Sequence, residues 1–150
     1  MATVSQKCQY ALRAVLELSR RYGGEPTSVA AIAKAQAIPQ RFLELIIGEL
    51  RQAGLVASKR GARGGYVLLR EPGELMVSDV MKAVDSNYAP VDCEPCGGNR
   101  DCPLDGRCSF VNLWRRAGAA IHEVYSETSF RNLLEEQSSL EGMTVDDYCI

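Results

Sequence analysis

The order of apolar stripes in the first 70 residues is the feature that most constrains the fold. Apolar side chains recur at helical spacing in residues 5–22, and a shorter segment follows that Thr27 or Ser28 can cap. A third helix is expected to begin at Pro39, whose missing N–H costs nothing there, and Gly54 stands where a helix end favours glycine. The apolar stripe predicted for this helix consists of Phe42, Leu43, Ile46, Ile47 and Leu50. The pattern therefore predicts three consecutive helices.

A β-hairpin is predicted directly after these helices. Residues 55–58 and 66–69 are short strand-forming runs, and the turn between them is rich in glycine and in basic side chains. Three helices followed by a hairpin is the order of a winged helix-turn-helix. Helical spacing predicts further helices at 77–84, at about 109–125 and at 128–136. We therefore expect a mainly α fold with a small β-hairpin: a winged helix-turn-helix plus a long dimerisation helix.

The chain divides into four predicted parts. A winged helix-turn-helix DNA-binding domain spans residues 1–85, and a cysteine-rich loop spans 86–108. Residues 109–137 would form the dimerisation helix and a closing helix, and the polar, acidic residues 138–150 are expected to be a flexible tail. Neither an 18-residue apolar run nor a secretory signal is present, so we expect no membrane contact and a cytoplasmic protein.

Charge is distributed unevenly between the two halves of the chain, although the formal net charge is only −2. Residues 1–70 hold 11 Lys and Arg against 4 Asp and Glu, which is +7, and residues 71–150 hold 6 against 15, which is −9. A basic half indicates a polyanionic partner. We therefore predict that the N-terminal half binds double-stranded DNA.

Two sets of side chains are predicted to contact DNA. The exposed face of the third helix would present Gln40, Arg41 and Glu44, which are residue types that hydrogen-bond base edges in the major groove. The hairpin turn carries three cations between glycines, so that both its backbone and its charges can approach phosphate. These cations are Lys59, Arg60 and Arg63. No nucleophile triad, P-loop or GxGxxG motif is found, so we predict that the chain is not an enzyme.

Four of the six cysteines lie in one polar segment rich in Gly, Pro and Asp. They are Cys93, Cys96, Cys102 and Cys108. In a reducing compartment, clustered thiols favour metal binding over disulfides. Their chemistry suits an iron–sulfur cluster, 4Fe–4S or 2Fe–2S, and the spacing alone suits structural zinc almost equally. A set of redox thiols without a metal is the third alternative.

The long helix after the cysteine segment carries an apolar stripe, and no later element is large enough to cover it. The stripe consists of Phe110, Leu113, Trp114, Ala117, Ile121 and Val124. An uncovered stripe of this kind indicates an interface, here between two copies of the chain. Such a homodimer would read two half-sites about one helical turn of DNA apart.

The chain resembles the IscR/NsrR/CymR family of bacterial winged-helix transcription regulators over roughly residues 4–135. The marks of this resemblance are KCQYALRA at 7–14, FLE at 42–44, LRQAGLV at 50–56, RGARGGY at 60–66, the pattern Cys96-x5-Cys102-x5-Cys108, and Leu113 with Trp114. The resemblance implies a homodimer that binds promoter DNA. It also implies an iron–sulfur cluster on Cys96, Cys102 and Cys108 that senses iron–sulfur status, redox or nitric oxide.

The cluster ligands of this chain depart from those of known family members. Some members place a histidine three residues after the last cysteine, where this chain has Val111. Others supply a carboxylate from the first helix, near the position of Gln9. Because Cys93 is an additional thiol and Cys8 lies beside Gln9, the fourth ligand would be Cys93, Cys8 or another group.

Two other functions also fit the sequence. CymR-like members of the family have no cluster and respond through a metabolic enzyme as protein partner, and the end of the chain at 148–150 would suit such docking. In the other alternative, zinc binds the cysteines and the chain is a zinc-stapled protein-interaction module with an incidental basic hairpin. A steep salt dependence of DNA binding would separate the regulators from the interaction module.

Overall fold

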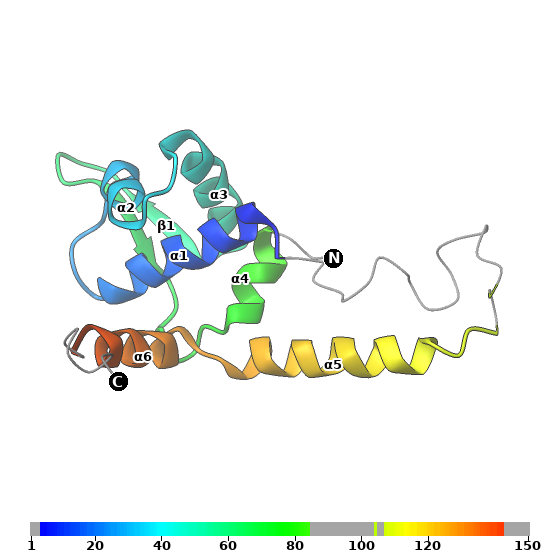
Figure 1. Ribbon diagram of the computed structural model, residues 1–150. Helices are drawn as coiled ribbons and strands as arrows, with labels where there is room; N and C mark the ends of the chain where they lie inside the picture. The colour runs from blue at the N-terminus through cyan, green and yellow to red at the C-terminus, as the bar shows by residue number, and fades with distance from the viewer. Residues whose placement is uncertain (1–3, 85–103, 105–106, 143–150) are drawn as a thin grey trace.

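The computed structural model describes residues 4–84, 104 and 107–142, with the elements in the predicted order (Figure 1). The elements are α1 (Gln6–Arg20), α2 (Val29–Gln36), α3 (Gln40–Gln52), β1 (Val56–Lys59), β2 (Gly65–Leu68), α4 (Val77–Val84), α5 (Val111–Glu127) and α6 (Phe130–Gly142). In Figure 1 the elements from α1 to α4 form one body, α6 runs beside α1, and α5 extends away from the body. In the part of the chain that the structure describes, no helix is both long and apolar enough to cross a membrane.

The hydrophobic core lies among α1, α2, α3 and α4, because each of these helices turns an apolar stripe toward the others. Its largest fully buried side chains are Phe130, Leu18, Ile32, Leu43, Ile46, Ile47, Leu50, Leu75, Met81, Val15, Val56 and Val80. Phe130 is the first residue of α6, and its N–H donates to the Leu75 carbonyl oxygen at 3.0 Å. The core therefore fixes the junction between α5 and α6 to the body.

Serine side chains cap the first two helices. The Ser5 hydroxyl accepts from the N–H of Cys8 at 3.2 Å, and the Ser28 hydroxyl accepts from the N–H of Ala31 at 3.2 Å. Of the two caps predicted for α2, Ser28 is confirmed. Thr27 is buried instead, and its backbone pairs with Tyr66 in the hairpin.

The predicted element ends differ from the observed ones mainly at the C-terminus. Each strand of the hairpin is displaced by one residue from its expected position. Helix α6 continues to Gly142, so the expectation that the flexible tail begins at 138 is wrong. In the last turn of this helix, Glu141 pairs with Arg20 of α1 at 2.7 Å, and this pair connects the end of α6 to the body. Residues 143–150 lie outside the described residues.

Candidate nucleic-acid interface

Helix α3 is buried on one side and exposed on the other. Leu43, Ile46, Ile47 and Leu50 are buried where the helix packs against α1, α2, α4 and β1. The three residues predicted to read DNA are all exposed: Gln40, Arg41 and Glu44. The Gln40 side-chain amide donates to Glu44 Oε1 at 3.1 Å, which orients the two side chains relative to each other. The exposed face of α3 is therefore free to enter a groove of DNA.

Phe42 was expected in the apolar stripe of α3, and the structure shows that this is wrong. Its side chain is 52% exposed, and the next apolar position outside the stripe, Leu45, is 69% exposed. Phe42 lies at the edge of the stripe, beyond the arc that the neighbouring elements cover. A run of apolar residues in a sequence does not by itself show which of them lie at that edge. Both side chains consequently add apolar surface to the exposed side of α3.

A tight turn connects α2 to α3. Ala37 adopts the left-handed conformation with φ 48° and ψ 48°, and the N–H of Ile38 donates to the carbonyl oxygen of Ala33 at 2.9 Å. Ile38 is buried, so the residue that follows the turn is anchored in the core. Since α3 begins two residues later, this turn sets the direction of the helix.

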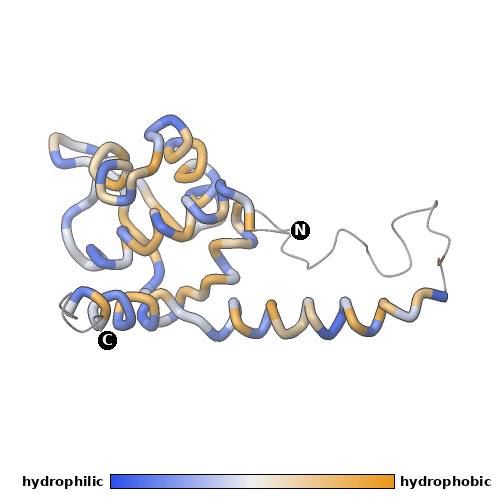
Figure 2. Tube along the Cα trace, viewed as in Figure 1, coloured by the Kyte–Doolittle hydropathy of each residue, from blue (hydrophilic) through white to orange (hydrophobic). Residues whose placement is uncertain are grey.

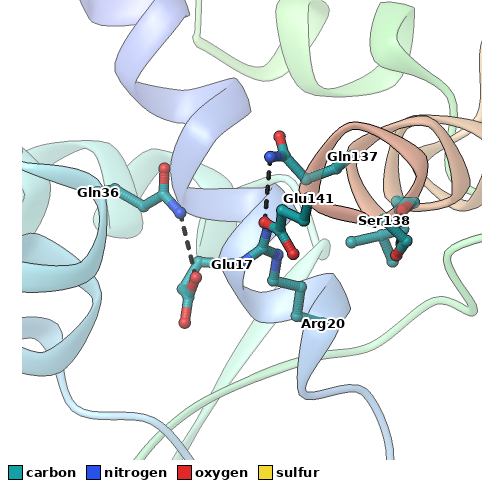
Figure 3. A network of polar contacts seen from close by, with 7 residues as sticks. Glu17, Arg20, Gln36, Gln137, Ser138 and Glu141 are labelled. Atoms are coloured by element: carbon teal, nitrogen blue, oxygen red, sulfur yellow. Dashed lines mark hydrogen bonds and ion pairs between the residues drawn. The ribbon is translucent and has the colours of Figure 1, made fainter. Parts of the chain in front are cut away.

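Residues of α1 hold the end of α2 in place. Glu17 is only 4% exposed, and its carboxylate accepts from the side-chain amide of Gln36 at 3.1 Å and from Arg21 at 2.8 Å. Arg13 donates to the backbone carbonyl of the same Gln36. Figure 3 shows Gln36 directed at Glu17. One turn further along α1, Arg20 pairs with Glu141 of α6. Gln36 is thus held through both its side chain and its backbone immediately before the turn.

The β-hairpin forms a short basic wing. Its strands pair in antiparallel register from Val56 opposite Leu68 to Lys59 opposite Gly65. Tyr66 exchanges two backbone hydrogen bonds with Thr27, at 2.8 and 3.0 Å, and these bonds join the wing to the segment before α2. The three predicted phosphate contacts are exposed: Lys59, Arg60 and Arg63. In Figure 1 the hairpin tip and α3 both project from the upper side of the body.

Two glycines of the wing stand where a side chain would not fit. A Cβ on Gly64 would lie 2.6 Å from the Lys59 carbonyl oxygen, and a Cβ on Gly65 would lie 2.5 Å from the carbonyl carbon of Thr27. The wing backbone is therefore packed tightly upon itself and upon the loop before α2, which holds the basic turn in a defined position.

The cations of this surface are available to a ligand. Within the described residues, ion pairs are formed by Lys7, Arg20, Arg21, Arg70 and Arg131. The predicted DNA-contacting cations are not among them: Arg41, Lys59, Arg60 and Arg63. Their charges can therefore be satisfied by phosphate or by base edges.

Most of the predicted metal site lies outside the described residues. This applies to Cys93, Cys96 and Cys102, whereas Cys108 is a half-buried free thiol three residues before α5. In residues 4–84, 104 and 107–142 no group of three or more His, Cys, Asp or Glu side chains could hold a metal ion. Cys8, the alternative fourth ligand, is buried in the core of the body.

Helix α5 buries none of its residues within the chain. Phe110, Leu113 and Val124 are 49%, 50% and 61% exposed. The other predicted interface residues, Trp114, Ala117 and Ile121, are half-buried, and the Trp114 ring stacks on that of Phe110 with centroids 6.1 Å apart. Figure 2 shows hydrophobic bands along the whole of α5. The predicted stripe is therefore present on one helix and is left largely uncovered by the described part of the chain.

The residues that position α3 were not predicted from the sequence. Glu17 and Gln36 are 19 positions apart, and their hydrogen bond forms only when α1 and α2 pack together. A carboxylate inside the apolar stripe of α1 was the available signal, since a buried charge needs a partner. The bonds between Thr27 and Tyr66 had no comparable signal, because they join backbone groups.

A helix with one buried and one exposed face, set by a rigid turn and followed by a tightly packed basic hairpin, defines a winged helix-turn-helix DNA-binding protein. A family model, Rrf2, described as "Iron-dependent Transcriptional regulator", matches residues 4–136. The chain belongs to the Rrf2 family, and it is a transcriptional regulator rather than an enzyme. This confirms the family resemblance and the fold class predicted from the sequence.

Relatives of two kinds lie within the family. The chain is 34% identical to the HTH-type transcriptional regulator IscR of Vibrio atlanticus (strain LGP32) over 138 residues, which cover 92% of this chain and 78% of the relative. The solved structure of T. potens IscR has a TM-score of 0.77 at 28% identity. The match covers 98% of this chain and 96% of the T. potens chain. The structure of CymR (YrzC), the global cysteine regulator of B. subtilis, has a TM-score of 0.74 at 33% identity. The match covers 91% of this chain and 98% of the CymR chain.

Proposed function

We propose that the protein is a homodimeric, sequence-specific DNA-binding regulator controlled by an iron–sulfur cluster. Cluster control is supported above all by the place of four thiols in the chain, between the winged body and the uncovered helix α5. In this proposal residues 1–85 bind DNA, 86–108 hold the cluster and 109–137 form the dimer. A change at the thiols would alter how the two bodies of the dimer are held, with a coupling free energy of about 1–3 kcal/mol.

The DNA contacts are divided between α3 and the wing. Gln40, Arg41 and Glu44 read base edges in the major groove, and Glu44, which repels phosphate, serves discrimination rather than affinity. The wing cations bind phosphate. Two uncovered stripes on α5, one from each copy, would form the dimer and place two α3 helices on successive half-sites.

The wing assignment predicts a change in the salt dependence of DNA binding. Arg60→Glu combined with Arg63→Glu should weaken binding to all duplexes alike, because the two cations contact phosphate and not bases. The slope of log affinity against log salt concentration should become shallower by about 2, since each phosphate contact contributes roughly 0.9. Lys82→Glu, at an exposed position of α4, is the control and should leave the slope unchanged. An unaltered slope in the double variant would remove the wing from the interface.

The donor set fits an iron–sulfur cluster chemically. Cysteine thiolates are the usual ligands of such clusters, and Cys108 is a free thiol that disulfide formation does not occupy. Cys96, Cys102 and Cys108 would hold the cluster, with Cys93, Cys8 or another group as the fourth ligand. When bound, the cluster would supply a centre that reacts with oxidants or nitric oxide.

The test of cluster control begins with metal and sulfide analysis and an absorption spectrum of protein purified without oxygen. We expect iron, sulfide and a visible band near roughly 400 nm, as thiolate-ligated clusters give. Cys102→Ala should abolish the band and change DNA affinity, and Cys149→Ala, in the tail, is the matched control. If the cluster-bound and cluster-free proteins bind DNA with equal affinity, the cluster does not control DNA binding, even if it is present. Stoichiometric zinc without colour would make the cysteine segment a structural staple.

A second candidate is a cluster-free regulator controlled by a protein partner such as a metabolic enzyme. The likeness to CymR favours it, since the match to CymR is about as strong as the match to IscR. In this case the purified protein is colourless and metal-free, and cluster reconstitution fails. A variant that ends at Gly142 keeps α6 and removes residues 143–150, so loss of partner capture by this variant would locate the docking segment.

A further inference from the structure

We infer that Leu45 contacts the C5-methyl group of a thymine in the major groove and thereby determines part of the DNA sequence that is recognised. Gly48, one turn further along α3, lets the helix approach the base pairs closely. This inference rests on the proposed entry of α3 into the groove and adds an apolar contact to the polar ones of Gln40, Arg41 and Glu44.

Leu45 lies in the middle of the exposed face of α3. It follows Arg41 by four residues and precedes Gly48 by three, and these spacings place all three on one side of a helix. The buried residues Leu43, Ile46, Ile47 and Leu50 occupy the opposite side. At 69%, Leu45 is the most exposed large apolar side chain in the described part of the chain. Its side chain is therefore free to contact a base edge when α3 lies in a groove.

Gly48 leaves open space on this face of α3, into which another surface can approach. It lies inside α3, has no positive φ, and a Cβ built on it would meet nothing within 4 Å. Neither backbone conformation nor packing within the described residues therefore requires a glycine, which is the least favourable helix residue after proline. Close approach of a ligand to α3 beside Leu45 would explain why a residue without a side chain stands at position 48.

The surrounding charges identify the ligand as DNA rather than an apolar protein surface. Leu45 is flanked by Arg41 and Glu44. The hairpin tip lies on the same side of the body as α3 (Figure 1), and its cations Lys59, Arg60 and Arg63 are exposed. An apolar partner would have to desolvate these charges, whereas phosphate satisfies the cations. The thymine methyl is the one apolar group that base pairs present in the major groove. A leucine among polar readers matches this group.

The experiment removes the methyl group from DNA and leaves everything else in place. The full-length wild-type chain first selects a duplex from a random library, and each thymine of that duplex is then replaced in turn by deoxyuridine. We expect one position in each half-site where this replacement weakens binding about fourfold, the effect of withdrawing one buried methyl group. Leu45→Ala should bind the thymine and deoxyuridine duplexes equally. Leu69→Ala, at a similarly exposed leucine outside α3, should keep the fourfold difference.

Each outcome decides between the proposals. A wild-type protein that does not distinguish thymine from deoxyuridine at any position overturns the inference, and so does a Leu45→Ala variant that still distinguishes them. Failure to select any duplex refutes sequence-specific DNA binding itself. Gly48→Ala should fold at least as stably as the wild type yet bind the selected duplex at least fivefold more weakly. Unchanged binding by this variant would refute the close approach at Gly48.

Discussion

At the scale of single residues, glycines determine whether the wing can form. Gly65 faces Thr27, and a Cβ there would lie 2.5 and 2.6 Å from the carbonyl carbon and oxygen of Thr27. The neighbouring residue Tyr66 makes both of its backbone hydrogen bonds to Thr27, so the two segments cannot separate without losing these bonds. The glycine-rich turn was readable from the sequence, but the backbone that requires the glycine is almost 40 residues away.

Gly65→Ala should therefore lower the free energy of unfolding by about 1–3 kcal/mol, the usual cost of overpacking. Urea denaturation followed by circular dichroism measures this change. Gly48→Ala is the matched control, since its Cβ meets nothing within 4 Å and its helical backbone suits alanine. We expect the control to raise the free energy of unfolding by about 0.4–1 kcal/mol. Equal midpoints for the two variants would contradict the tight packing of the wing.

At the scale of elements, the position of α3 depends on how α1 holds the end of α2. Glu17 is buried and is bonded to Gln36 and Arg21, and Gln36 directly precedes the turn that sets the direction of α3. The link between α1 and α6, formed by Arg20 and Glu141, is by contrast exposed at both side chains.

Glu17→Ala should lower the free energy of unfolding by about 1–3 kcal/mol, because it leaves the half-buried amide of Gln36 without this acceptor. Affinity for the selected duplex should fall as well, since the turn before α3 loses a support. Glu141→Ala removes the exposed pair with Arg20 and an exposed hydrogen bond from Gln137, and it should cost less than about 1 kcal/mol. Thermal melting and DNA titration of both variants provide the measurement. The role of Glu17 would be disproved if both variants lost the same stability and bound DNA normally.

At the scale of the whole molecule, the proposed dimer depends on the uncovered stripe of α5. Leu113→Glu combined with Val124→Glu places two charges on this stripe and should convert a dimer into monomers, because burying unpaired charges at an interface is costly. Analytical ultracentrifugation measures the mass. Leu69→Glu places the same charge on an exposed leucine outside α5 and should leave the dimer intact. A wild-type chain that sediments as a monomer would remove α5 as a self-interface.

From the sequence alone one could predict the order of the helices, the hairpin, a cap at Thr27 or Ser28, the left-handed Gly54 and the exposure of Arg41 and Glu44. These features depend on spacings of a few residues, which the sequence displays directly. Tertiary structure alone decided that Phe42 is exposed, that Glu17 meets Gln36 and that α6 runs on to Gly142. Such features depend on which distant segment packs against a residue, and the path of the chain in space determines that contact.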